Sequence, residues 1–126
     1  MNYLIDAYAW IEYLEGSTAG SKVRKIIEEN EAITLSITLA EVISKVKRKG
    51  LDENNAYQAI TSNSIISDVT ADVARSAGIF HAEIRKKVPN FGLVDSLLLA
   101  GARSKKIKVV TGDHHFKGFK ETLFIG

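Results

Sequence analysis

The chain has 126 residues, of which 45% are hydrophobic and 25% charged, with a formal net charge of +2 at pH 7. These values are typical of one globular domain, and we expect a single domain over residues 1–126. The chain has no cysteine, which excludes disulfides, thiolate catalysis and cysteine-bound zinc. No apolar run reaches the roughly 18 residues that span a membrane, and the first residues are acidic where a signal peptide is basic. We therefore expect a cytoplasmic protein without a membrane partner.

In chain order, short apolar strands alternate with stretches of helical periodicity. We predict a strand over 3–6, helices over 9–16 and from 17 or 18 to about 30, a strand over 32–36, helices from 38 to a stop at 50 and from 52 to about 60, a strand over 64–67, helices from 70 to about 87 and over 93–105, and strands over 108–111 and 122–125. Several helix starts are set by residues that favour N-caps, namely Ser17 or Thr18, Thr38, Asp52 and Thr70.

Strands separated by helices pair in parallel and are covered by helices on both faces. The sequence therefore predicts the α/β class, with a three-layer α/β/α architecture and a central, mostly parallel sheet of four to five strands. In such a sheet the strands end at one edge, the following helices begin there, and ligands bind there at the point where the strand order reverses.

Four acidic residues are predicted to share this edge. Asp6 ends the first strand, Glu41 and Asp95 lie in the first turns of helices, and Asp113 follows the strand over 108–111. Each position alone has an ordinary explanation, since acids favour helix starts and turns. Asp6 and Asp95, however, lie in the apolar segments YLIDAYAWI and GLVDSLLLAGA, where burying a charge without a partner is costly.

Carboxylates that converge without a basic side chain repel one another unless a cation lies between them. Oxygen ligands select hard ions, which indicates Mg²⁺ or Mn²⁺. Acids at this edge, with no evident pair of nucleophile and base, are typical of metal-assisted hydrolysis of phosphodiester bonds.

The ordered motifs resemble those of the PIN domain, and most of all the compact, VapC-like toxin ribonucleases of prokaryotes. The resemblance covers the whole chain. It consists of the segment YLID ending in Asp6, the segment ITLAEV with Glu41, the segment LVDSLLLAGA with Asp95, and the segment TGDHHF with Thr111 and Asp113.

The resemblance implies a PIN-like fold and an endoribonuclease that depends on Mg²⁺ or Mn²⁺ and acts on RNA. It also implies a homodimer that a cognate antitoxin neutralises. Asp6, Glu41 and Asp95 would be the metal ligands, Asp113 would complete the site directly or through water, and Thr111 would orient the surrounding groups.

The chain departs from the family pattern at two positions. Tyr8 stands where the family often has Ser or Thr, and Gly112 stands where a basic residue often precedes the last Asp. Neither change removes a carboxylate, so the catalytic interpretation is kept and the substrate preference stays open.

Two other classes of function have sequence signatures that differ from this one. A non-catalytic, PIN-like module that binds RNA or protein would most simply have lost one of the four acids, and all four are present. A phosphatase of the haloacid dehalogenase type needs a second Asp where Tyr8 stands. A phosphoacceptor receiver domain needs additional acids and a lysine after a late strand, which the sequence does not clearly offer.

The histidines and the basic runs are the remaining polar features of the sequence. His114 and His115 are adjacent in a tight turn, where side chains point apart, so we do not expect them to bind one ion together. The basic runs over 45–49, 85–87 and 103–108 lie near predicted helix C-termini, where cations complement the helix dipole. The alternative is an RNA-backbone patch. Its candidates are Arg48 and Lys49 near Gly50, and Lys117 and Lys120 near Asp113.

Overall fold

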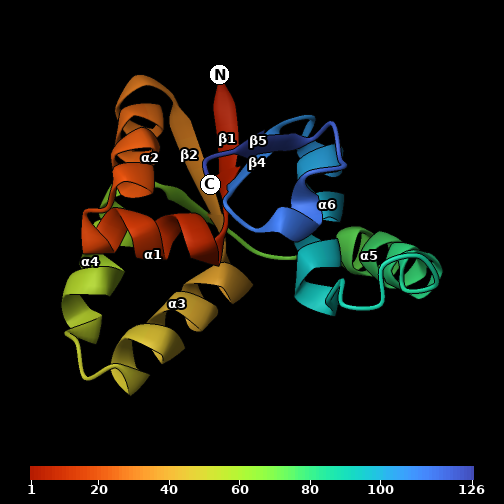
Figure 1. Cartoon of the computed structure of the whole chain (residues 1–126), viewed down its shortest axis with the longest axis horizontal. Helices are drawn as coiled ribbons and strands as arrows, with labels where there is room; N and C mark the ends of the chain where they lie inside the picture. Colours follow the sequence, from red (N-terminus) through yellow and green to blue (C-terminus); the bar gives the residue numbers. More distant parts are fainter.

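Five short strands form one sheet in the computed structural model, which describes residues 1–126 (Figure 1). The strands are β1 Asn2–Ile5, β2 Glu31–Leu35, β3 Ile65–Ser67, β4 Lys108–Thr111 and β5 Thr122–Phe124. Their order is β3-β2-β1-β4-β5, and every neighbouring pair is parallel. The predicted α/β class is confirmed, and the sheet is parallel throughout.

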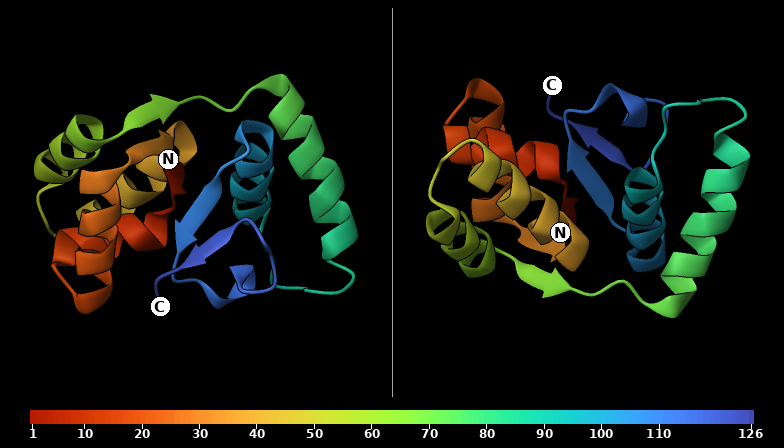
Figure 2. Two further views of the ribbon diagram at one scale, coloured as in Figure 1. Left: turned by 90° about the horizontal axis from the view of Figure 1, so that it is seen from above. Right: turned by 90° about the horizontal axis from the view of Figure 1, so that it is seen from below.

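Helices cover both faces of this sheet (Figures 1 and 2). They are α1 Ala7–Glu15, α2 Thr18–Glu29, α3 Ser36–Arg48, α4 Glu53–Asn63, α5 Ala71–Ile84 and α6 Leu93–Lys105, with a short 3₁₀ helix, η1, at His114–Phe116. Helices α1 to α4 pack on one face, while α6 packs on the other with α5 along its outer side. None of these helices is both long and apolar enough to cross a membrane.

The central strands are buried on both sides. In β1, Leu4 belongs to the core under α6 and Ile5 to the core under α1 to α4. In β4, Val109 belongs to the core under α6 and Val110 to the core under α1 to α4. This explains why the strands have continuous apolar runs instead of alternating patterns. Each such side chain, fully buried, contributes about 1.5–3 kcal/mol to stability.

Most predicted helix starts are confirmed. The side chains of Ser17, Asp52 and Thr70 each accept a hydrogen bond from a backbone amide in the first turn of the following helix. Two helices begin earlier than predicted: α1 begins at Ala7 and not at residue 9, and α3 begins at Ser36 and not after Thr38. The chain passes from β2 into α3 without a loop, Leu35 takes the cap position without a side-chain bond, and Thr38 is buried within the helix.

Helix α5 is shorter than predicted. It ends at Ile84, and residues 85–87 continue as turns in which the Lys87 amide donates to the Ile84 carbonyl at 2.9 Å. Pro89 keeps the chain from continuing as a helix beyond these turns, because the residue before a proline, here Val88, is disfavoured in the helical conformation.

The topology defines where a ligand can bind. β1 lies at the centre, and the chain first moves outward to β2 and β3 and then returns to the other side of β1 for β4 and β5. The strand order therefore reverses between β1 and β4, and the carboxyl ends of these two strands form the switch point at which α/β proteins bind their ligands.

Candidate metal centre

Asp6 directly follows β1 and is the N-cap of α1, with its Oδ1 accepting a hydrogen bond from the Ala9 amide at 2.8 Å. Only 4% of the residue is exposed. The pKa of the Asp6 carboxyl is raised to about 7, mainly by burial and also by the carboxylates of Asp113 and Asp95. Hydrogen bonds from the Thr111 hydroxyl and the Ala9 amide oppose the shift without cancelling it. A buried acid at a switch point is thus held close to its protonation midpoint at neutral pH.

Asp95 lies in the first turn of α6, as the sequence predicts. Its Oδ2 accepts a hydrogen bond from the Gly92 amide at 3.2 Å, which fixes the carboxylate across the start of the helix. Burial raises the pKa of the Asp95 carboxyl, and the Asp113 carboxylate raises it too. The bond from Gly92 and the neighbouring His115 act in the opposite direction.

Asp113 follows β4 and caps η1. Its amide donates to Thr111 Oγ1 at 3.0 Å, and its Oδ1 accepts from the His115 amide at 2.9 Å. Because the Thr111 hydroxyl also bonds to Asp6, this threonine links two of the predicted acids. Thr111 is fully buried, so its hydroxyl cannot turn to solvent.

His115 also lies in this group, although no sequence pattern predicts its place there. Its Nδ1 lies 3.3 Å from Asp113 Oδ1, and the ligand atoms of Asp95, Asp113 and His115 all lie within 4.8 Å of one another. The two histidines do point apart, because the His114 ring packs 5.3 Å from that of Phe124. The 3₁₀ turn is what directs one of them toward the acids.

Glu41 reaches the cluster from α3. It lies in the second turn and not in the first, because α3 starts earlier than predicted. The residue is exposed at the rim of the site. Partial burial raises the pKa of the Glu41 carboxyl, and the Asp95 carboxylate raises it as well. Glu41 is therefore electrostatically coupled to the same centre.

The structure brings the other three predicted acids within electrostatic reach of Asp95. Asp6 is affected by Asp95 and Asp113, and Glu41 by Asp95. No lysine or arginine forms an ion pair with any of them, and His115 is the one side chain that pairs with Asp113. A divalent cation would relieve this repulsion, and the predominance of carboxylate oxygens fits Mg²⁺ or Mn²⁺.

Comparison with known proteins identifies the fold family. The family model of the PIN domain matches residues 3–121 of the chain. The chain belongs to the PIN domain family. Its structure is similar to the toxin-antitoxin complex from Klebsiella pneumoniae, with 20% identity over 98% of each chain and a TM-score of 0.79.

Two further solved structures share this fold. VapC20 of Mycobacterium tuberculosis, a sarcin-ricin loop cleaving toxin, is 18% identical over 92% of this chain and 93% of its own, with a TM-score of 0.73. A DNA-bound VapBC from Salmonella typhimurium is 19% identical over 100% of this chain and 99% of its own, with a TM-score of 0.77. A comparison with curated proteins found no match to the sequence.

In this PIN domain the two departures from the family pattern contact each other. A Cβ atom placed on Gly112 would lie less than 3.0 Å from three atoms of the Tyr8 ring. Gly112 therefore makes room for Tyr8, whose ring lies beside the turn that carries Asp113. Tyr8 still leaves 45% of its surface exposed.

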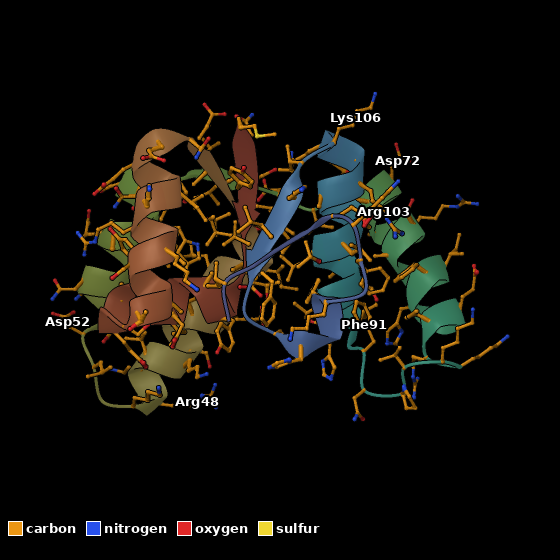
Figure 3. All side chains as sticks on the ribbon, turned by 45° about the horizontal axis from the view of Figure 1, so that its top comes forward. Arg48, Asp52, Asp72, Phe91, Arg103 and Lys106 are labelled. Atoms are coloured by element: carbon orange, nitrogen blue, oxygen red, sulfur yellow. The ribbon has the colours of Figure 1, made fainter.

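An aromatic cluster supports the two loops of the PIN domain site. Phe91 (Figure 3), which precedes the amide donor Gly92, is buried. Its ring lies 5.6 Å from that of Phe116 at the end of η1. Phe119 packs on the same ring at 5.5 Å. These contacts hold the loop before Asp95 against the turn after Asp113.

The basic residues divide into paired and unpaired groups. In the run over 45–49, Lys47 pairs with Glu53 and Lys49 with Glu15, whereas Lys45 and Arg48 form no ion pair. The run over 103–108 lies on the far side of the molecule from Arg48, as Figure 3 shows for Lys106.

Proposed function

We propose that this chain is a metal-dependent endoribonuclease, the VapC-like toxin of a toxin-antitoxin pair. It would hydrolyse RNA phosphodiester bonds with Mg²⁺ or Mn²⁺ held by Asp6, Glu41, Asp95 and Asp113. The observation that carries this proposal is that Asp6, Asp95 and Asp113 gather at the β1–β4 switch point of a PIN domain. Glu41 is coupled to Asp95 from α3, and none of the four acids has a lysine or arginine partner.

The similar solved structures support the toxin assignment. One is described as a toxin that cleaves the sarcin-ricin loop, and others are complexes of toxins with antitoxins. On this likeness we extend the proposal to a cognate antitoxin as the protein partner. The proposal also includes a homodimer that acts in the cytoplasm.

The chain's own residues would each have a defined task in this reaction. A bound divalent ion lowers the pKa of water and stabilises the negative charge that develops on the phosphate. Asp6 releases its proton readily near pH 7 and so becomes available as a ligand. Thr111 forms hydrogen bonds to both Asp6 and Asp113 and so fixes their relative positions. The Gly92 amide fixes Asp95. His115 restrains the Asp113 carboxylate.

The decisive experiment is a cleavage assay on a panel of single-stranded and structured RNAs with Mg²⁺, Mn²⁺ or EDTA. We expect cleavage that depends on the metal and is abolished by Asp95→Asn, which keeps an oxygen for the Gly92 amide. His114→Ala is the matched control, since His114 lies on the same turn but packs on Phe124. Undiminished cleavage by Asp95→Asn, or in EDTA, would contradict the proposal. RNA binding without any cleavage would instead favour a non-catalytic module.

A further inference from the structure

A groove of about 500 Å³ runs between α1 and α3 and includes Glu41 in its lining. Tyr8 and Ile11 line it from α1, while Lys45 and Arg48 line it from α3. Glu41, Lys45 and Arg48 are spaced by four and three residues, so they follow one face of the helix over a rise of about 10 Å. The groove therefore leads away from the acid cluster along α3.

The two cations in this groove differ from their neighbours in sequence. Lys47 Nζ lies 3.1 Å from Glu53 Oε1, and Lys49 Nζ lies 3.2 Å from Glu15 Oε1. Lys45 and Arg48 have no carboxylate within ion-pair distance. In the segment KVKRK, Lys47 and Lys49 are thus held in ion pairs. Lys45 and Arg48, one helical turn apart, are left to line the groove.

The same groove has an aromatic residue beside the acids. Tyr8 immediately follows the first residue of α1, and its ring lies against Gly112 in the turn that ends at Asp113. An exposed aromatic ring next to two free cations is the combination with which proteins bind single-stranded nucleic acid. The ring stacks on a base, and the cations contact the backbone phosphates.

We propose that this groove binds the single-stranded RNA next to the scissile phosphate, with one base stacked on Tyr8 and backbone phosphates on Lys45 and Arg48. This inference rests on the proposed ribonuclease function and names the side chains that would select its substrate. Arg48 Nε donates to the Ser44 carbonyl at 3.3 Å, which restrains the guanidinium along the groove. The groove favours RNA because, beyond Glu41 at its acidic end, its unpaired charges are both positive and follow each other along its length.

The first test measures binding of a short, fluorescein-labelled, single-stranded oligoribonucleotide by the full chain carrying Asp95→Asn, which prevents cleavage. Each phosphate contact on a single strand contributes about 0.7 to the slope of log K against log salt. We expect Lys45→Ala/Arg48→Ala to reduce this slope by about 1.4. The double variant Lys47→Ala/Lys49→Ala removes the same charge from the same run and should leave the slope unchanged.

The second test isolates stacking with an oligoribonucleotide that contains 2-aminopurine. In the Tyr8→Leu variant, RNA binding should no longer quench the fluorescence of 2-aminopurine. Binding should weaken by about five- to 150-fold, the usual cost of losing one stacked base. Tyr8→Phe should retain both. Tyr57, also exposed but on α4, provides the control Tyr57→Leu.

The inference is overturned if the two double variants lose the same slope, or if quenching persists in Tyr8→Leu. It is also overturned if every variant binds RNA as well as the parent does. The groove would then be a candidate binding site for a protein segment instead of RNA. Kinetics with the cleaving chain separate this inference from the proposed function. If the groove variants cleave RNA with metal and with an unchanged KM, the groove assignment is wrong but the ribonuclease function stands. If RNA binds through the groove and is never cleaved, the ribonuclease function is wrong but the groove assignment stands.

Discussion

The carboxylate of Asp6 accepts a hydrogen bond from the Ala9 amide at 2.8 Å, so the most buried acid of the site is also the N-cap of α1. The same carboxylate would therefore serve both the helix and the proposed metal. This double role makes the effect of a substitution depend on whether the new side chain can still cap the helix.

Asp6→Asn and Asp6→Ala should separate the two roles. Asparagine caps helices as well as aspartate, whereas alanine does not, so Asp6→Ala should be less stable than Asp6→Asn by about 0.5–2 kcal/mol. Both variants should lose RNA cleavage. Urea unfolding in EDTA measures the difference in free energy. Equal stability of the two variants would show that the hydrogen bond to Ala9 contributes nothing to the fold.

The metal-free protein should become less stable as the pH rises from about 4 to about 7. The pKa of Asp6 is raised to about 7, so across this range the folded chain holds a proton that the unfolded chain releases. The unfolding free energy falls wherever the native state binds more protons, by about 1.4 kcal/mol for each pH unit per group. Urea unfolding of the wild type and of Asp6→Asn in EDTA at several pH values tests this.

The Asp6→Asn variant should show a flatter pH profile, because it lacks the titrating group. Asp95 and Glu41 also have raised pKa values and should account for the slope that remains. Adding Mn²⁺ to the wild type should recover stability, most strongly near pH 7, where Asp6 deprotonates. Identical profiles for the two proteins would contradict the raised pKa.

His115 should matter for metal binding and His114 should not. The His115 Nδ1 lies 3.3 Å from Asp113 Oδ1, while the His114 ring packs on Phe124. Loss of a residue that orients a ligand typically weakens metal affinity by about 10–100-fold. Calorimetric titration of Mn²⁺ into His115→Ala and His114→Ala measures both effects. A greater loss in His114→Ala would refute this division of roles.

Tyr8 and Gly112 should behave as a coupled pair. Gly112→Ala forces a methyl group against the Tyr8 ring, at a cost of about 1–3 kcal/mol. The double variant Tyr8→Ser/Gly112→Ala removes the ring and should regain much of that cost. A double-mutant cycle by chemical unfolding gives the coupling energy. Additive effects would mean that the ring moves aside freely.

The fold and the acids at the strand ends could be predicted because both depend on local patterns. Apolar runs separated by helical periods dictate a parallel sheet, and residues directly after β1 and β4 must lie at its carboxyl edge. Asp6, Asp95 and Asp113 lie where this argument places them. Their roles as metal ligands stay a proposal that the cleavage assay addresses.

Other features depend on tertiary structure and could not be predicted. The contact between Tyr8 and Gly112 joins segments at opposite ends of the chain, and only the pairing of β1 with β4 brings them together. The approach of His115 to Asp113 depends on a single 3₁₀ turn, which has no sequence period. The start of α3 was misplaced because a tight strand-to-helix junction needs no capping residue, and Thr38 only resembles one.

The absence of a loop between β2 and α3 limits how this chain can vary in length. Because the strand runs directly into the helix, the direction of Glu41 is set by counting residues from Leu35. One residue inserted there would rotate Glu41 by about 100° around the helix axis and turn it away from the other acids. Insertions between α1 and α2 or between α3 and α4 would leave this helical phase intact. Length variation among related chains should therefore avoid the segment from Leu35 to Glu41 and collect in those connections.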